Sequence, residues 1–326
     1  MRDHVGQSSR RDGGLNVQRH NAVEWLRVVS ALGIVWFHAG VPGSQWGYAG
    51  LVVFLLLSMM FEAGPNHAKI QPLKTRAVRL LVPWAFWWVV YAGLNIVQQQ
   101  PIVDADNGLI AGVLTGPSVH LWYLPFAFVV LAAFGAAKPR IPFLVLAFGS
   151  AATATVLIFG IPLWRPISLE AGFPFGQWAH ALAPILMGLL LGCCLRSRGV
   201  WILWAPVSAA LIWACFRPFA DVAPIYLLAL GLTVGAMLVP RATANRLPPA
   251  GLTSGAMLGV YLVHPLALFV MRPLTEMGPP LGVIAAFAIS TIGVLAAQLL
   301  APWPSSLLLG TAKPEGRQLT RWPLRT

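Results

Sequence analysis

Three ionisable side chains lie in a segment that is otherwise apolar enough to cross a bilayer. Glu24, Arg27 and His38 occur within NAVEWLRVVSALGIVWFHAG, residues 21–40. An ionisable residue at the centre of a spanning helix costs about 2.5–3.5 kcal/mol on insertion scales, so such residues usually face a protein interior and serve a function. Helical geometry brings the three side chains to one face. The segment therefore predicts a polar stripe whose Arg27 and His38 ends are about 16 Å apart along the helix axis.

These residue types suit either of two functions. Histidine exchanges protons near neutral pH, and arginine binds phosphate and carboxylate groups through a planar fork. An enzyme could use His38 as a base while Arg27 holds an anionic donor. A proton-coupled transporter of an anion could use the same residues as a relay. The spacing within the segment leaves both functions open.

Two arginines open another apolar stretch further along the chain. Arg76 and Arg79 are one helical turn apart in LKTRAVRLLVPWAFWW, and Pro83 follows one turn later. Basic residues at a helix start commonly anchor it at the cytoplasmic membrane surface. A pair of guanidinium groups on the same side of the membrane as Arg27 equally suits an anionic ligand. Pro83 predicts a gap in the backbone hydrogen bonds, a feature often found beside a cavity.

Single polar residues interrupt two further apolar runs. Ser58 lies within GYAGLVVFLLLSMMF and could bond to a backbone carbonyl or serve a site. Trp122 and Tyr123, in HLWYL, are of the types that gather at membrane interfaces. For His120, in the same motif, we expect contact with solvent.

The later part of the chain carries a second buried pair and a long connection. Tyr261 and His264, in YLVHP, are three residues apart and share a helix face. His180 has little polar company at helical spacing, so we expect it in the core or at an interface. The connection at 162–175 carries Arg165, and its prolines and aromatic residues predict a loop that packs over the outer side and contacts an acceptor.

The composition indicates an integral membrane protein. The chain has 326 residues, of which 57% are hydrophobic and 10% charged, whereas soluble domains carry about 25% charged residues. The net charge of +12 comes from basic residues scattered among short connections, so nucleic acid is not expected as a partner. Cys193, Cys194 and Cys215 lie in apolar runs, and neither a disulfide framework nor a metal site is expected.

Apolar segments of spanning length recur along the whole chain. We expect an all-α fold, a polytopic membrane helical bundle with about ten transmembrane helices. The predicted segments are 22–41, 47–64, 77–97, 118–137, 141–161, 176–195, 199–216, 222–240, 252–272 and 279–301. This transmembrane domain, residues 22–301, lies between a disordered basic cytoplasmic tail, 1–21, and a cytoplasmic C-terminal tail, 302–326.

The charges of the connections predict the orientation, because cytoplasmic connections are rich in lysine and arginine. Most of the 22 basic residues lie in the tails or in alternate connections, for example Arg19, Lys69, Lys138, Arg196 and Arg241. The longest of the other connections carries Asp104 and Asp106 and no basic residue. We therefore expect a multi-pass protein of the inner or plasma membrane with both termini in the cytoplasm. Arg27 then lies toward the cytoplasm and His38 toward the outer side.

Five motifs, in this order, resemble those of the membrane acyltransferase-3 family. The family has an arginine, ten further residues and a histidine in its first helix, which VEWLRVVSALGIVWFH resembles. Its glycine-led second helix resembles GYAGLVVFLLLSMMF, and its Arg-x-x-Arg-Leu-x-x-Pro motif resembles RAVRLLVPW. Its Leu-Trp-Phe/Tyr-Leu and Tyr-Leu-x-His-Pro motifs resemble LWYL and YLVHP. Met59 and Met60 stand where the family commonly has Gly and Phe, which predicts altered helix packing.

The resemblance implies an activity and its substrates. Members of the family are O-acyltransferases that modify surface polysaccharides, glucans, nodulation factors and macrolides. The implied reaction moves an acyl group, with acetyl expected, from acyl-coenzyme A to a hydroxyl of a carbohydrate, glycosylated or small-molecule acceptor. The implied partners are therefore acyl-coenzyme A, the acceptor and the lipid bilayer.

The resemblance also implies roles for the residues singled out above. His38 would be the catalytic residue, as general base or transient acyl carrier, with Arg27 and Glu24 beside it. Arg76 and Arg79 would receive the phosphates of coenzyme A. The residues that would bind substrate or support the site are Ser58, Trp122, Tyr123, Tyr261 and His264. The mostly apolar pantetheine arm would lie along the stripe from Arg27 to His38.

Overall fold

A computed structural model describes residues 20–65, 71–103 and 108–310, and the described chain is helical without a strand. The long helices are α1 (Asn21–His38), α3 (Ala49–Ala63), α4 (Leu73–Val97), α6 (Tyr123–Ala137), α7 (Phe143–Phe159), α9 (Phe175–Arg196), α10 (Trp204–Ala214), α11 (Ala223–Leu238), α14 (Met257–Val270) and α16 (Pro279–Leu300). Each predicted apolar segment overlaps one of these helices. The expectation of an all-α helical bundle is confirmed.

Short helices connect or extend the long ones. They are α2 (Ser44–Gly47), α5 (Leu109–Thr115), η1 (Val119–Trp122), η2 (Lys138–Arg140), α8 (Ile161–Glu170), η3 (Arg198–Leu203), α12 (Arg241–Ala244), α13 (Gly251–Gly255), α15 (Arg272–Met277) and α17 (Pro302–Leu308). The helix α17 packs against α4 and α16, so the folded chain extends beyond residue 301. Arg19, Lys69, Asp104, Asp106 and residues 311–326 lie outside the described residues, as does most of the predicted N-terminal tail.

The structure does not confirm the expected count of about ten membrane spans. Within the described residues, five helical stretches are long and apolar enough to cross a membrane. The bent pair α7 and α8, which meet at 74°, raises the number to six if it counts as one span. The other helices fall short for physical reasons: α1 carries Glu24 and Arg27, and the helical stretches around α10, α11 and α14 have fewer than 18 residues. The helical bundle is therefore established, and the count of ten spans is not.

The predicted loop at 162–175 is largely helical. Residues 161–170 form α8, with Pro162 in its first turn, where a proline's missing N–H costs no hydrogen bond. The long connection is therefore an ordered element rather than an irregular loop.

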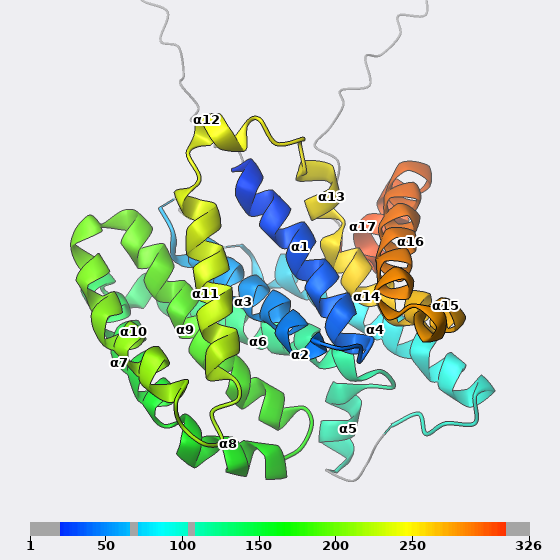
Figure 1. The fold of residues 1–326 in the computed structure, drawn as a ribbon, viewed down its shortest axis with the longest axis horizontal. Helices are drawn as coiled ribbons and strands as arrows, with labels where there is room; N and C mark the ends of the chain where they lie inside the picture. Colours follow the sequence, from blue (N-terminus) through cyan, green and yellow to red (C-terminus); the bar gives the residue numbers. More distant parts are fainter. Residues whose placement is uncertain (1–19, 66–70, 104–107, 311–326) are drawn as a thin grey trace, which may run out of the picture.

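Helix α1 lies between two groups of helices (Figure 1). It contacts α3 and α11 on one side and α13, α14 and α16 on the other. Its first residue, Asn21, is fixed to the chain that follows α12. The Asn21 side-chain amide donates to the carbonyls of Leu247 (2.8 Å) and Pro248 (2.9 Å), and its Oδ1 accepts from the Ala250 amide (3.0 Å). These bonds set the position of the polar stripe relative to both groups.

Small residues let α1 and α3 approach closely. A Cβ atom on Gly50 would lie 2.1 Å from the Ser30 carbonyl oxygen, and one on Gly47 would lie 2.3 Å from that of Gly33. Both distances are far below van der Waals contact, so glycine is required at these two positions. Helix α1 therefore packs directly against the glycines of the GYAG motif.

The two methionines of α3 pack against α9. Met59 and Met60 are almost completely buried. On the facing helix, a Cβ on Gly192 would lie 2.6 Å from the Met60 carbonyl oxygen, and one on Gly188 would lie 3.0 Å from the Met59 Cβ. The glycines of α9 thus let the backbones of α9 and α3 approach closely, which describes how the helices pack where this sequence departs from the family pattern.

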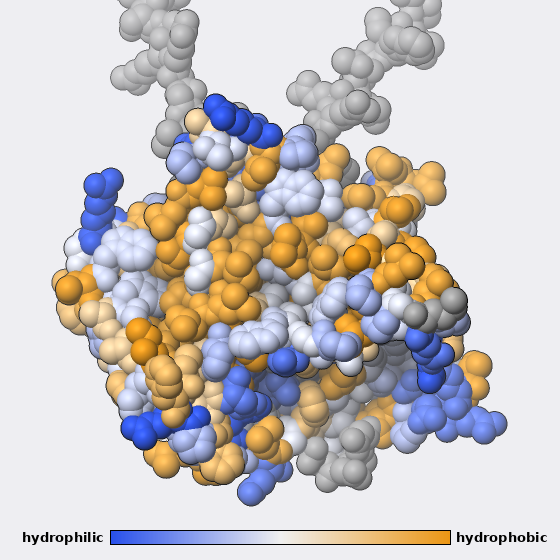
Figure 2. Space-filling view, in the orientation of Figure 1, coloured by the Kyte–Doolittle hydropathy of each residue, from blue (hydrophilic) through white to orange (hydrophobic). Residues whose placement is uncertain are grey.

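Hydrophobic residues cover most of the face shown in Figure 2. Hydrophilic residues gather near α12 at one end and around α8 and the outer end of α4 at the opposite end. An apolar belt between two polar ends is the surface expected of a protein that sits in a bilayer.

The close contact between α1 and α3 gives a prediction. Gly50→Ala places a methyl group against the Ser30 carbonyl, and overpacking of this kind costs about 1–3 kcal/mol. We expect a lower thermal unfolding midpoint for the variant purified in detergent. Gly93→Ala in α4 is the control, because nothing lies within 4 Å of its added Cβ. Equal midpoints for the two variants would contradict the packing described here.

Candidate functional site

A cavity of about 440 Å³ lies beside α1 at the level of Arg27. Seven of the sequence-predicted site residues line it: Glu24, Arg27, Ser58, Arg76, Arg79, Tyr123 and Tyr261. They come from α1, α3, α4, α6 and α14, so the fold brings together motifs from distant parts of the chain, from Glu24 to Tyr261. Of the remaining predicted residues, His38 and His264 lie beyond Tyr261, and Trp122 packs behind Tyr123.

Glu24 joins Arg27 to a residue that the sequence did not single out. Its Oε2 lies 3.7 Å from Nη1 of Arg27, the i, i+3 pair expected on one helix face. The same oxygen accepts a short hydrogen bond from the Ser254 hydroxyl in α13. The Arg27 side chain is 32% exposed and its Nε has no hydrogen-bond partner. Glu24 therefore holds Arg27 loosely and is itself fixed by α13.

Arg76 is fully engaged within the protein. It is buried and forms an ion pair with Glu62 at the end of α3. Its other nitrogens donate to the carbonyls of Leu131 (2.5 Å) and Gln71 (3.3 Å). A buried carboxylate and guanidinium are stable only as a well-bonded pair. This geometry gives Arg76 a structural role and leaves it few donors for a phosphate group.

Arg79 differs from Arg76 although it lies one turn away. Its side chain is exposed and lines the cavity, and it forms no ion pair or hydrogen bond with any described residue. The charged residues of the cavity comprise three arginines and two glutamates. Because Arg27 is near Glu24 and Arg76 is bonded to Glu62, Arg79 is the cation left without a counter-ion. The cavity therefore suits an anionic group at Arg79.

The aromatic residues of the fourth predicted segment are buried. Trp122 and Tyr123 have little exposed surface, so they are not members of an interfacial belt. Tyr123 lines the cavity, and the ring of Trp122 contacts it edge-on at 6.0 Å. The Tyr123 ring in turn lies 5.5 Å from that of Tyr261. Trp122 therefore supports the wall of the cavity rather than forming it.

Three histidines meet beyond Tyr261. The ring of His264 lies 5.0 Å from that of His38 and 5.2 Å from that of His120, and the His38 and His120 rings are 6.3 Å apart. Tyr261 joins this group to the cavity, with its ring 5.9 Å from His264 and 5.4 Å from His120. Its hydroxyl donates a short hydrogen bond to the His120 carbonyl. We call His38, His120 and His264 the histidine cluster.

Pro265 explains how His264 is held. A proline has no N–H, so the carbonyl four residues earlier, that of Tyr261, loses its helical partner. The His264 ring takes this place, with Nδ1 at 2.6 Å from the Tyr261 oxygen. A carbonyl can only accept, so Nδ1 carries the proton and Nε2 of the neutral ring is free to accept one. This Nε2 is buried and has no hydrogen-bond partner.

His120 is a functional candidate that the sequence reading missed. It was expected in solvent, but it is 1% exposed. Its Nδ1 lies 2.8 Å from the Ser118 hydroxyl, and its Nε2 is buried without a partner. The signal in the sequence that could have indicated a role for His120 is its position directly before the LWYL motif. Within the described residues, no group of three His, Cys, Asp or Glu side chains suits a metal ion.

Fold and site together define a helical membrane protein in which a cavity rich in arginine lies next to a cluster of histidines, with Tyr261 between them. A family model described as an acyltransferase domain matches residues 20–299. The chain belongs to this family, the membrane acyltransferase-3 family, and is a membrane acyltransferase. A search of curated proteins and a search of solved structures each found no match.

The ion pair between Arg76 and Glu62 gives a second prediction. Arg76→Ala leaves Glu62 buried without its partner, which costs about 3–5 kcal/mol. We expect a large fall in the thermal unfolding midpoint of the purified variant. The exposed Lys74, in the same helix, is the matched control, and Lys74→Ala should unfold like the wild type.

A double variant separates loss of the charge pair from loss of packing. Replacing both partners by apolar residues, Glu62→Leu with Arg76→Met, leaves no buried charge, so stability should recover. A double variant as unstable as Arg76→Ala would show that the hydrogen bonds to Leu131 and Gln71 matter more than the pair.

Proposed function

We propose that the protein transfers an acyl group from acyl-coenzyme A to a hydroxyl of a carbohydrate or glycosylated small molecule. One observation carries the proposal. The cavity lined by Arg27 and Arg79 reaches Tyr261, and Tyr261 contacts the histidine cluster. An anion-binding cavity and a proton-accepting cluster thus lie next to each other with Tyr261 between them, and the proposal requires the acyl end of the donor to pass Tyr261.

The charge and shape of acyl-coenzyme A are the reasons for proposing it as the donor. Coenzyme A carries phosphate groups at one end and a thioester at the other, joined by a long and mostly apolar arm. Arg79, which lacks a counter-ion, would bind a phosphate through charge-assisted hydrogen bonds. The partly exposed Arg27 would bind a second one or the thioester carbonyl. The arm would then lie along α1 with the thioester at the histidine cluster.

The reaction needs a base for the acceptor hydroxyl. In the proposed step, a histidine nitrogen of His38 takes the hydroxyl proton while the oxygen attacks the thioester carbonyl. The new C–O bond forms, the C–S bond breaks, and the leaving thiolate takes up the proton. The products are an ester and free coenzyme A, so no proton is gained or lost overall.

The other two histidines would serve His38. Each has a buried Nε2 without a hydrogen-bond partner. His264 is held in one tautomer by the Tyr261 carbonyl, so its Nε2 is set to receive a proton or a hydrogen bond from the neighbouring ring. His38, which is only partly buried, is the member of the cluster that an acceptor can reach.

Removing the base tests the proposal. We expect His38→Ala to lower the rate of acylation by at least about 10²-fold, since general-base catalysis contributes about 10²–10⁴-fold. The measurement uses membranes supplied with labelled acetyl-coenzyme A and an extract of cellular glycans. His20→Ala, which alters a histidine outside the cluster, should keep full activity.

The same preparation distinguishes a base from an acyl carrier. With the donor alone, the intact mass of the wild-type protein should show no added acyl group. Acylation that persists in His38→Ala would remove His38 from the chemistry, whereas an acyl adduct on His38 would replace the base by a covalent intermediate.

The unpaired arginine gives a further prediction. Arg79→Ala should raise the apparent KM for acetyl-coenzyme A by roughly tenfold or more, because a hydrogen bond to a charged group contributes about 1.5–3 kcal/mol. The KM for the acceptor should stay unchanged. Lys74→Ala is again the control, since it removes a positive charge from the same helix outside the cavity lining. An unchanged donor KM in Arg79→Ala would exclude the proposed phosphate contact.

A further inference from the structure

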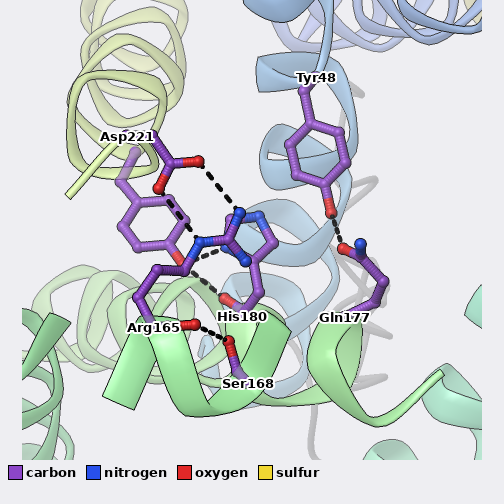
Figure 3. Close-up of polar contacts among 7 residues, drawn as sticks. Tyr48, Arg165, Ser168, Gln177, His180 and Asp221 are labelled. Atoms are coloured by element: carbon purple, nitrogen blue, oxygen red, sulfur yellow. Dashed lines mark hydrogen bonds and ion pairs between the residues drawn. The ribbon is translucent and has the colours of Figure 1, made fainter. Parts of the chain in front are cut away.

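A second group of polar side chains lies at the end of the bundle where α1 ends, opposite α12 (Figures 1 and 3). It is built from α8, α9, the start of α11 and the junction of α2 and α3. Its members are Tyr48, Arg165, Gln177, His180, Asp221 and Tyr226. None of them lines the cavity beside Arg27. We call this group the outer polar cluster.

The base of the outer polar cluster is rigid. His180 and Tyr226 are buried, and their rings stack at 5.1 Å. Pro184 lies four residues after His180, so the His180 carbonyl lacks a helical partner, and it accepts from the Tyr226 hydroxyl at 2.6 Å. The Tyr226 oxygen also lies 2.7 Å from Nδ1 of His180. These bonds fix the floor of the cluster.

The upper part of the cluster offers groups that are still able to bind. Arg165 holds Asp221 through two parallel bonds, of 3.1 and 3.0 Å, yet the Asp221 side chain is 64% exposed. A carboxylate can accept about four hydrogen bonds, so Asp221 keeps acceptor capacity. The Gln177 side chain accepts from the Tyr48 hydroxyl at 3.0 Å, which leaves its two N–H donors without a described partner.

The cluster is connected to His38 by a short series of ring contacts. The Phe37 ring lies 5.2 Å from that of His38 and 4.9 Å from that of Tyr48. The Tyr48 ring lies 5.0 Å from that of His180. A molecule whose reacting group is at His38 could therefore reach Tyr48 and Gln177 with an adjoining unit.

The charge of the outer polar cluster indicates what that unit is. Arg165 and Asp221 neutralise each other, so the cluster carries no net charge. Gln177 nevertheless offers donors and Asp221 offers acceptors, and a sugar hydroxyl, which is both donor and acceptor, needs both. The cavity with the unpaired Arg79 suits an anion, whereas this cluster suits a neutral molecule rich in hydroxyl groups.

From this geometry we infer that the outer polar cluster binds a neutral sugar unit of the acceptor, adjacent to the sugar whose hydroxyl is acylated at His38. The inference rests on the proposed function, because it assigns the acceptor of that reaction. Asp221 and Gln177 would hold the sugar hydroxyls, and Tyr48, packed against Phe37 and His180, would keep Gln177 in position through its hydroxyl. None of these residues would take part in the chemical step.

The test measures binding separately from chemistry. The probes are four neutral disaccharides (maltose, cellobiose, lactose and sucrose) and one anionic disaccharide, cellobiouronic acid. Thermal unfolding of the purified His38→Ala variant is followed with each. We expect at least one neutral disaccharide to raise the midpoint, and cellobiouronic acid not to. The rise should vanish when Asp221→Asn or Gln177→Ala is added.

The control is another exposed carboxylate in an ion pair. Glu276 pairs with Arg272 in α15, and Glu276→Gln should leave the disaccharide response unchanged. In the active protein, Asp221→Asn should raise the KM for the stabilising disaccharide by about tenfold and leave the KM for acetyl-coenzyme A unchanged.

The outcomes separate this inference from the proposed function. Lack of stabilisation by every neutral disaccharide, an equal rise in Asp221→Asn, or a preference for the anionic probe would each overturn the sugar site. Acylation of cellular glycans that depends on His38 would still support the proposed function in those cases. Loss of that dependence would overturn the proposed function instead.

Discussion

The burial of charge in apolar surroundings is the constraint on which the rest of this structure depends. An unpaired carboxylate or guanidinium inside a helical membrane protein is strongly destabilising, and the protein meets this cost with specific partners. Glu62 bonds to Arg76, and Glu24 bonds to Ser254 and lies near Arg27. These pairs join α1, α3, α4 and α13 around one cavity. Among the described residues that line the cavity, every other charge has a partner, so Arg79 is the group best suited to bind an anion there.

A proline within a helix positions buried side chains at two places in the structure. Pro265 and Pro184 each free the carbonyl four residues earlier, and each freed carbonyl is used by a side chain of a buried histidine–tyrosine pair. At Tyr261 the His264 ring donates, and at His180 the Tyr226 hydroxyl donates. The same backbone gap thus fixes a histidine in the cluster at His38 and another in the outer polar cluster. Rigid side chains are what a site needs when its groups must meet a substrate at a defined distance.

The sequence predicts the helices of this protein better than the contacts between them. Apolar length alone locates the long helices, and the motifs around Arg27, Tyr123 and Tyr261 indicate which of them share a cavity. Three features could be found only from the structure. Glu62 and Arg76 are on different helices, so their pairing could not be found by helical spacing, although a lone glutamate at the end of an apolar segment was a signal. His120 was expected in solvent, and its burial could not be found from the sequence because its cluster is formed by helices distant in sequence. The count of about ten spans is not confirmed, because apolar composition does not reveal which helices are long and apolar enough to cross alone.

Phe37 separates the histidine cluster from the outer polar cluster along one path. Its ring lies between His38 and Tyr48, and a phenyl ring can neither donate nor accept a proton. Along this path, a chain of proton-conducting groups that begins at the histidine cluster ends at Phe37. A proton taken up by the cluster is therefore not passed through side chains to Tyr48, and the two polar clusters exchange no protons along this series of rings.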